Sequence, residues 1–318
     1  GHAYAAGILT NEDLEKIVET SDEWITTRTG IKQRRKAAPE EYTSMFAVRA
    51  ARQAIERARL DPSDIDLLLC ATVTPDQILP STGCIVQAEL GANNAAAMDI
   101  VAACSGFLYG VSLADSMIRT GQVRHAVVVG AEILTQYVDY TDRKTCVLFG
   151  DGAGAAVLGP ANEGGRGILA SRIKSDGRYE EQLFSPGGGT RKKPTAETLA
   201  AGDHFFKMRG NELFKVAVRS MAEISRDVLQ TAGVKSDDIS LFIPHQANQR
   251  ITEAVADRLN VDMSRVYSNI AVHGNTSSAS IPIALDECVE AGRIKEGDLV
   301  LMTSFGGGVT WGAVLMRW

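Results

Sequence analysis

The chain has 318 residues, of which 45% are apolar and 23% are charged, as expected for one large globular domain or two fused ones. Its 33 Lys and Arg against 39 Asp and Glu give a net charge of −6 without a basic tract, so we expect no nucleic-acid partner. Its apolar runs fall short of the ~20 residues of a membrane-spanning helix and no secretory pattern opens it, so we expect a cytoplasmic protein without a membrane partner.

Cysteine and histidine usage argues against disulfides and metals. The five cysteines include no C-x-x-C pair, and their odd number does not suit a disulfide framework. The five histidines show no clustered ligand spacing. The sequence therefore predicts reduced cysteines and no metal site.

Apolar runs typical of strands alternate along the chain with amphipathic patterns typical of helices. The expected strands are 67–71, 96–101, 126–130, 155–158, 241–243 and 299–303, and the clearest helical patterns are 47–59 and 210–231. Loops are expected at 162–167 and at 185–194, where glycine and charged residues interrupt the pattern. This alternation predicts an α/β fold with a buried sheet.

The chain contains an internal repeat. The segment that starts at Ala47 resembles the one that starts at Ala217, since each has a helix, a Ser/Asp turn and an apolar strand, with an offset of 174 residues. A second matching pair, around Gly121 and Gly292, has an offset of 171 residues. The two halves, 1–160 and 161–318, are therefore predicted to be duplicated copies of one fold.

The repeat also predicts which residues lie together in a functional site. The offset of 171 aligns Cys104 with Asn275, and the offset of 174 aligns His245 with Ala71. Equivalent strand ends and helix starts meet where the halves of a duplicated fold pack together. We therefore expect Cys104, His245 and Asn275 to lie in one site, although they are distant in sequence.

Each of these residues also has a purely structural interpretation. Cys104, in "IVAACSGF", precedes a predicted helix whose start would lower the pKa of the thiol, yet free cysteine is among the most buried residue types and is more often an inert core residue. His245, in "PHQANQRI", follows a strand as many catalytic residues do, or it packs and caps. Asn275, in "HGNTSSAS", is by itself a polar turn residue or helix cap.

Two glycine-rich segments differ in what they predict. "FGDGAGAAVLG" has a G-x-G-x-G spacing without a clear amphipathic helix after it, which indicates tight strand packing and not phosphate binding. "SFGGGVTWG" follows a strong apolar strand, and its glycines allow close backbone approach, either in a simple turn or as an oxyanion donor.

Six motifs in order, "TSDEWITTRTGI", "DIVAACSGF", "FGDGAGAAVL", "PHQANQRI", "HGNTSSASIP" and "FGGGVTWG", closely resemble the β-ketoacyl-acyl carrier protein synthase III family from about Thr10 to the C-terminus. The resemblance implies the thiolase fold, a duplicated, five-layered αβαβα architecture with pseudo-twofold symmetry, and a homodimer. It implies that a short acyl-CoA, usually acetyl-CoA, acylates Cys104. Malonyl-acyl carrier protein then loses CO2 and attacks the acyl-enzyme, which begins fatty acid biosynthesis with no cofactor besides the CoA thioester substrate.

The resemblance also implies residue roles. Cys104, His245 and Asn275 form the catalytic set, with His245 and Asn275 donating to the malonyl thioester oxygen, and the backbone N–H groups of Cys104 and Gly307 form the oxyanion hole. The substrate positions that it implies are CoA-binding Trp24, Arg28, Arg143, Gly210 and Asn248, carrier-protein docking Arg250, Lys215 and Arg258, and acyl-channel Leu79, from the neighbouring subunit, and Phe305.

Several alternatives stay open at this point. A starter ketosynthase of polyketide or other secondary metabolism would share the fold and differ in its acyl donor or acceptor. Cys-His-Asn is also the constellation of papain-like hydrolases, and a non-catalytic carrier-protein-binding module is a third possibility. Elongating synthases, with a second histidine where this chain has Asn275, and thiolases, with a further late cysteine, are disfavoured.

Overall fold

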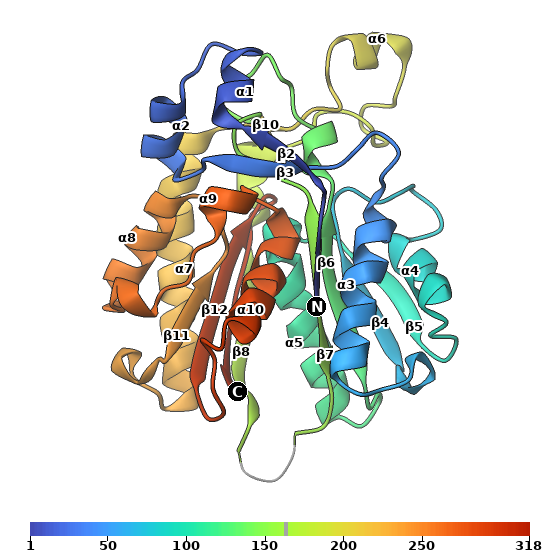
Figure 1. The fold of residues 1–318 in the computed structure, drawn as a ribbon, viewed down its shortest axis with the longest axis vertical. Coiled ribbons are helices and arrows are strands. Elements are labelled where there is room, and N and C mark those ends of the chain that lie inside the picture. The colour runs from blue at the N-terminus through green and yellow to red at the C-terminus, as the bar shows by residue number, and fades with distance from the viewer. Residues whose placement is uncertain (162–164) are drawn as a thin grey trace.

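The computed structural model describes residues 1–161 and 165–318, so part of the loop expected at 162–167 lies outside the described residues. Strands and helices alternate along the chain (Figure 1). The strands are β1 (His2–Tyr4), β2 (Gly7–Thr10), β3 (Gln33–Lys36), β4 (Leu67–Ala71), β5 (Ala96–Ile100), β6 (Ala126–Glu132), β7 (Gly152–Leu158), β8 (Gly167–Ser175), β9 (Leu183–Phe184), β10 (Lys207–Met208), β11 (Leu241–Pro244), β12 (Leu299–Gly306) and β13 (Thr310–Arg317). The α-helices are α1 (Asn11–Glu15), α2 (Asp22–Thr29), α3 (Thr43–Arg57), α4 (Thr82–Leu90), α5 (Gly106–Arg119), α6 (Ala196–Ala200), α7 (Gly210–Ala232), α8 (Gln249–Leu259), α9 (Ile270–His273) and α10 (Ser280–Glu290).

Two mixed sheets form the centre of the molecule. The first has the order β1-β7-β6-β4-β5, with β4 parallel to both β5 and β6, and β7 antiparallel to β6 and β1. The second has the order β11-β12-β13-β8, with β11 and β12 parallel and the remaining pairs antiparallel. Every residue of β4, β6 and β12 is buried, which explains why these strands are continuous apolar runs in the sequence.

Three apolar clusters separate the layers. In one cluster, α3 and α4 pack on the outer face of the first sheet, and in another, α7 and α8 pack on the outer face of the second. The third lies between the sheets and contains the inner faces of α5 and α10 (Figure 1). The result is the five-layered αβαβα arrangement that the repeat and the family resemblance led us to expect. No helix among the described residues is both long and apolar enough to cross a membrane.

The structural repeat corrects one detail of the sequence alignment. Two short 3-10 turns, η2 (Ala103–Ser105) and η7 (Ser277–Ala279), precede α5 and α10, and each begins with a residue in the left-handed region, at φ 45° and φ 50°. Their first residues are 174 positions apart (277 minus 103). Cys104 is therefore equivalent to Ser278, and its alignment with Asn275 was wrong.

The cause of that error is the length of the two central helices. The helix α10 has 11 residues and α5 has 14, so the offset falls from 174 at the helix starts to 171 past the helix ends. Gly121 and Gly292, which gave the offset of 171, lie beyond these ends, where both have positive φ. The division of the chain into halves at residue 160 stays a prediction.

Small residues bring α5 onto the first sheet. A Cβ on Gly106 would lie 2.8 Å from the Cβ of Ala71, and one on Gly110 would lie 2.6 Å from Cγ1 of Val128. Both glycines thus allow the helix to pack directly on β4 and β6. This contact fixes the position of the turn that carries Cys104, immediately before the helix.

Candidate active site

Cys104 lies in the turn between β5 and α5, and it is 6% exposed. The strained, left-handed backbone of Ala103 (φ 45°) turns the chain sharply just before it. A Cβ on Gly306 would lie only 2.7 Å from the Cys104 backbone nitrogen. The end of β12 can therefore approach the backbone of Cys104 this closely only because residue 306 is glycine.

His245 follows β11, and its backbone N–H donates to the Thr303 carbonyl at 2.8 Å. Its Nδ1 lies 2.6 Å from the Ser280 hydroxyl oxygen, which also accepts from the Gln246 N–H at 3.4 Å. Nδ1 is the one acceptor near this hydroxyl group among the described residues, so we infer that the Ser280 hydroxyl donates to Nδ1 and that the ring proton resides on Nε2. The buried Nε2 has no hydrogen-bond partner among the described residues, and burial lowers the pKa of His245 to about 3. A neutral imidazole thus presents an N–H donor.

Asn275 is held on its backbone and on its side-chain oxygen. Its N–H donates to the Leu148 carbonyl at 2.8 Å, and its carbonyl accepts from the Gly150 N–H at 2.9 Å. Its Oδ1 accepts from the Ser277 N–H at 2.8 Å. The amide oxygen is therefore engaged within the protein, and the NH2 group is the end that can donate to a ligand.

One short segment, residues 275–280, connects the three predicted catalytic residues. It contains Asn275, its Ser277 side chain acts to lower the pKa of the Cys104 thiol, and its Ser280 hydroxyl oxygen lies 2.6 Å from Nδ1 of His245. The turns η2 and η7 also pack against each other at the junction of the two halves. The three residues are therefore gathered about one segment, as the duplicated fold led us to expect.

The electrostatics of Cys104 differ from the expectation. A helix start and hydrogen bonds favour the thiolate, but burial outweighs them and raises the pKa of the Cys104 thiol to about 12. Ser277 opposes this rise, whereas the nearby Glu132 carboxylate adds to it. In the free protein the thiol is therefore protonated near neutral pH, and acylation needs a group that accepts its proton.

Sequence reasoning missed Glu132, the last residue of β6, which is fully buried. Its carboxylate is hydrogen-bonded by the first half, through Thr72 and Thr74, and by the second half, through Ser277 and Ser278. The available signal was a charged residue at the end of the apolar run "AVVVGAE", where a carboxylate needs several donors to be buried.

The residues expected to hold the CoA nucleotide gather at the end of α2. The guanidinium carbon of Arg28 lies 4.6 Å from the centre of the Trp24 ring, and that of Arg143 lies 5.0 Å from it. Arg143 also donates to the Glu19 carbonyl at 2.9 Å. Both arginines are exposed, so a half-buried indole and two cations form a surface suited to an aromatic, anionic group.

The two expected pantetheine contacts lie at helix starts. Asn248 caps α8, since its Oδ1 accepts from the Arg250 N–H at 2.9 Å, while its Nδ2 donates to the Arg28 carbonyl at 3.0 Å. It therefore ties α8 to the nucleotide surface on α2. Gly210 is the exposed first residue of α7, where a Cβ would contact only Met208, at 3.7 Å.

The residues predicted for the oxyanion hole and for the acyl channel lie around the β12–β13 turn and on a distant loop. Gly306 makes the close contact with Cys104, and the predicted donor Gly307 packs against the Leu183 carbonyl, so the role of Gly307 stays a prediction. Phe305 is buried in the cluster beneath α7. Leu79 is 84% exposed, in the loop before α4, and within one chain it does not meet Phe305.

The structure separates the three predicted docking residues. Arg250, at the start of α8, lies 6.0 Å from the Phe214 ring centre, and Lys215 is the next residue along α7. Arg258 is in the last turn of α8, about 12 Å along the helix axis from Arg250. Arg250 and Lys215 can therefore share one positive surface, and Arg258 extends away from it.

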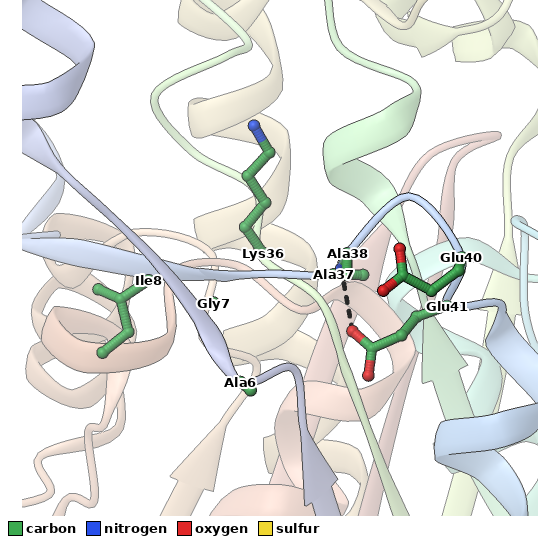
Figure 2. Close-up of a pocket in the computed structure, with 8 residues that line it drawn as sticks. All are labelled: Ala6, Gly7, Ile8, Lys36, Ala37, Ala38, Glu40 and Glu41. Atoms are coloured by element: carbon green, nitrogen blue, oxygen red, sulfur yellow. Dashed lines mark hydrogen bonds between the residues drawn. The ribbon is translucent and has the colours of Figure 1, made fainter.

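Two surface cavities lie apart from this centre. The smaller, of about 460 Å³, is formed by β2 and the chain after β3, where the Ala38 N–H donates to Glu41 Oε2 at 2.9 Å (Figure 2). The larger, of about 960 Å³, is lined by residues of α3, α5, β7, β8, α10 and β13. Among their described lining residues, neither includes Cys104, His245 or Asn275.

Comparisons with known proteins identify the family of this chain. Two family models match, described as 3-oxoacyl-(acyl-carrier-protein (ACP)) synthase III over residues 98–177 and its C-terminal part over residues 229–318. A relative from Roseiflexus sp. (strain RS-1), named beta-ketoacyl-(acyl-carrier-protein) synthase III, is 52% identical over 100% of this chain and 96% of its own length. The crystal structure of 3-oxoacyl-(acyl-carrier-protein) synthase III from Aquifex aeolicus VF5 is 51% identical, with a TM-score of 0.93, over 100% of this chain and 98% of that one.

A priming beta-ketosynthase from the R1128 polyketide biosynthetic pathway is also similar in structure, with 35% identity, a TM-score of 0.92, and coverage of 100% of this chain and 94% of that one. These similarities extend over the whole of this chain. The fold is therefore the thiolase fold of these enzymes. This chain belongs to the 3-oxoacyl-(acyl-carrier-protein) synthase III family.

Proposed function

We propose that the protein catalyses the decarboxylating condensation of a short acyl-CoA, acetyl-CoA in the first instance, with malonyl-acyl carrier protein, and so initiates fatty acid biosynthesis. One observation carries the proposal. In the segment 275–280, Ser277 acts to lower the pKa of the Cys104 thiol, the Ser280 hydroxyl oxygen lies 2.6 Å from Nδ1 of His245, and the Asn275 amide is fixed by its oxygen. A nucleophile and two neutral N–H donors are what the two half-reactions require.

In the first half-reaction, the Cys104 sulfur attacks the thioester carbonyl of the acyl-CoA. The carbonyl oxygen gains negative charge, which the backbone N–H groups of Cys104 and Gly307 would stabilise. CoA then leaves, taking up the proton that the thiol released. The product is an acyl-Cys104 thioester, which retains a good leaving group for the next step.

In the second half-reaction, malonyl-acyl carrier protein occupies the site and loses CO2. The electrons of the broken bond move toward its thioester oxygen, and the N–H groups of His245 and Asn275 can donate to this oxygen as its charge grows. Neutral donors suit this task because they stabilise the enolate without protonating it. The carbanion carbon attacks the acyl-Cys104 carbonyl, which releases the cysteine and the 3-ketoacyl product.

Two surfaces support the choice of substrates. Trp24 with Arg28 and Arg143 offers an aromatic and cationic surface for the CoA nucleotide, and Asn248 and Gly210 lie at helix starts along the expected path of pantetheine. The positive surface of Arg250 and Lys215 would attract the acidic carrier protein, although the chain as a whole is acidic.

We also propose a homodimer built on the β5 edge of the first sheet, because the apolar side chains of Ile78, Leu79 and Val101 are 93%, 84% and 78% exposed near this edge. Val101→Asp should then reduce the molecular mass measured by sedimentation to that of one chain.

The five cysteines are free, which suits the cytoplasmic setting that we propose. We further propose that no cofactor takes part beyond the CoA thioester.

The test is a reconstituted reaction. Purified protein, malonyl-acyl carrier protein and radiolabelled acetyl-CoA should give a labelled 3-ketoacyl-acyl carrier protein, with release of one CO2 per product. The control variant Asn275→Ala should still become acylated but lose most of the condensation. Absence of the labelled product with the wild-type protein would contradict the proposed function.

The relative named as a priming ketosynthase of a polyketide pathway makes that role the second candidate. The same assay separates the two when it is run with a series of acyl-CoAs of increasing length. Highest kcat/KM with acetyl-CoA supports initiation of fatty acid synthesis. A preference of tenfold or more for a longer or branched starter, equivalent to about 1.4 kcal/mol, favours the priming role.

A further inference from the structure

Glu132, the last residue of β6, is a fully buried carboxyl group that the reaction above does not use. Its Oε2 accepts hydrogen bonds from the Thr74 hydroxyl at 2.7 Å, the Val73 N–H at 3.1 Å and the Thr72 hydroxyl at 3.2 Å. Its Oε1 accepts from the Ser277 hydroxyl at 3.1 Å. One oxygen of this carboxylate is therefore held by the chain after β4, and the other is directed at the segment 275–280.

Two serines of that segment lie equally close to Oε1, but they are not equivalent. The Ser278 hydroxyl oxygen is also 3.1 Å from Oε1, yet it is only 2.8 Å from the Ala71 carbonyl oxygen. A hydroxyl group has one hydrogen, so Ser278 divides it between these two acceptors. Ser277 is therefore the firmer partner of the carboxylate, and Ser278 offers a comparison with it.

Ser277 connects this carboxylate to the amide of Asn275. Its backbone N–H donates to Asn275 Oδ1 at 2.8 Å, and this bond leaves the NH2 group as the end that can donate to a ligand. The backbone of Ser277 is left-handed, at φ 50°, a conformation that a residue with a side chain keeps only where its surroundings hold it. The hydroxyl contact with Glu132 is one such hold.

The strand β6 also approaches this turn with its backbone. A Cβ on Gly130 would lie 2.3 Å from the Ser278 carbonyl oxygen and 3.0 Å from the Ala279 nitrogen. Gly130 and Glu132 are two residues apart on one strand, so they face the same side of the sheet. The end of β6 thus brings its backbone against η7 and places a carboxylate beside the strained serine.

We propose that Glu132 is a positioning residue for the condensation step, which acts through Ser277 to hold the Asn275 amide in its donating orientation. The inference rests on the proposed function for its substrate. Without the carboxylate contact the strained turn can relax, and the amide of Asn275 can rotate by about 180°, because its two ends have nearly the same shape. The amide oxygen would then face the growing negative charge on the malonyl thioester oxygen and slow the loss of CO2.

Acylation of Cys104 responds to Glu132 in the opposite direction. The negative charge of Glu132 adds to the rise of the Cys104 pKa, so its removal favours the thiolate. Asn275 takes no part in acylation under the proposed function. A change at Glu132 should therefore slow condensation and leave acylation equal or faster, whereas a general loss of packing would slow both half-reactions.

The test compares Glu132→Gln with Ser278→Ala, a matched control that removes the other hydroxyl group near Oε1. Rapid quenching with intact-mass analysis measures acylation by acetyl-CoA, and CO2 release measures the reaction of malonyl-acyl carrier protein, both at pH 7. For Glu132→Gln we expect CO2 release to fall on the order of tenfold, less than the loss of a whole donor, with acylation no slower than in the wild type. Ser278→Ala should stay within about threefold of the wild type in both reactions.

A double variant tests whether Glu132 acts through Asn275. Once Asn275→Ala has removed the amide, Glu132→Gln has nothing left to misplace, so the double variant should release CO2 no more slowly than Asn275→Ala alone. Two losses that multiply would overturn the inference. A Glu132→Gln variant that slows acylation and CO2 release equally would overturn it as well.

Crystal structures of the wild type and of Glu132→Gln separate this inference from the proposed function. We expect the variant to lose the left-handed backbone of Ser277 and its 2.8 Å contact with Asn275 Oδ1. An unchanged turn would overturn the positioning role, whether or not substrates react. A wild type that releases no CO2 from malonyl-acyl carrier protein would refute the proposed function and leave the structural comparison readable. If circular dichroism shows that Glu132→Gln does not fold, Ser277→Ala, which removes the same contact from its other side, takes its place.

Discussion

The hydroxyl of Ser280 lies 2.6 Å from Nδ1 of His245 and fixes which nitrogen of that imidazole carries the proton. The two residues are distant in sequence and come from different elements, the end of β11 and the start of α10. Nδ1 is the one acceptor near the Ser280 hydroxyl group among the described residues, so the hydroxyl hydrogen is directed to that nitrogen. The N–H donor at Nε2 of His245 therefore depends on Ser280, a residue to which the sequence assigned no role.

Ser280→Ala should impair condensation more than acylation. Loss of this hydrogen bond allows the other tautomer, in which Nε2 cannot donate, so we expect kcat for the reaction with malonyl-acyl carrier protein to fall about tenfold, corresponding to about 1.4 kcal/mol. The rate at which Cys104 is acylated by acetyl-CoA should change by less than about twofold, because His245 acts in the second step. An equal loss in both steps would contradict this role of Ser280.

Trp24→Ala should weaken the binding of CoA without slowing chemistry. The ring lies within 4.6 Å of Arg28 and 5.0 Å of Arg143, and its loss removes the aromatic face offered to the nucleotide. We expect KM for acetyl-CoA to rise about tenfold at unchanged kcat. Acetyl-pantetheine, which lacks the nucleotide, serves as the control, and a similar rise with that substrate would show that Trp24 does not contact the nucleotide.

Gly306→Ala should abolish acylation through backbone displacement. The new Cβ would lie 2.7 Å from the Cys104 nitrogen, so either the turn at Cys104 or the end of β12 must move. Displacement of one oxyanion donor typically costs about 100-fold in rate. Gly177→Ala is the matched control, since nothing lies within 4 Å of its Cβ, and it should react like the wild type. Normal acylation of Gly306→Ala would refute the proposed close contact.

Glu287→Gln should destabilise the fold in a pH-dependent manner. Glu287 accepts hydrogen bonds from the side chains of Tyr4, His273 (2.8 Å), Tyr267 (2.9 Å) and Asn269 (2.6 Å). These bonds lower the pKa of Glu287 to about 2, although burial acts in the opposite direction. A lowered folded-state pKa adds stability above the unfolded value of about 4.3, and this stability is lost as the pH falls toward 2.

We expect the free energy of unfolding of Glu287→Gln, measured with urea, to be lower than that of the wild type by about 2 kcal/mol at pH 7, a value reduced for the partial exposure of this carboxylate. The difference should shrink at pH 3. A difference that is the same at both pH values would show that packing, and not charge, accounts for the effect.

Strong local patterns were sufficient to predict much of the fold. The run Leu67–Ala71 was predicted with its observed bounds because it is buried on both faces and wholly apolar. The strand β13 was missed, because its half-buried ends and the adjacent Trp311 and Gly312 interrupt the apolar pattern. The 171-residue offset was taken from residues beyond the ends of α5 and α10. It misaligned Cys104, which lies before the helix starts, because α5 has 14 residues and α10 has 11.

The candidate site was predictable where a residue lies at an element boundary and unpredictable where a contact crosses the two halves. Cys104, His245 and Asn275 each follow or precede a recognisable element. Glu132 and Ser280 act through tertiary contacts with segments about 145 and 35 residues away, which periodicity does not encode. The rise of the Cys104 pKa was likewise missed, because the degree of burial of a thiol follows from packing and not from the helix start beside it.

The most direct test of the central claim is intact-mass analysis after mixing the protein with acetyl-CoA in the absence of malonyl-acyl carrier protein. We predict that the wild type gains the mass of one acetyl group, that peptide mapping places it on Cys104, and that added malonyl-acyl carrier protein removes it. Cys104→Ala should gain nothing. A wild type that acquires no acyl group from any short acyl-CoA, or a Cys104→Ala variant that still acquires one, would contradict the account.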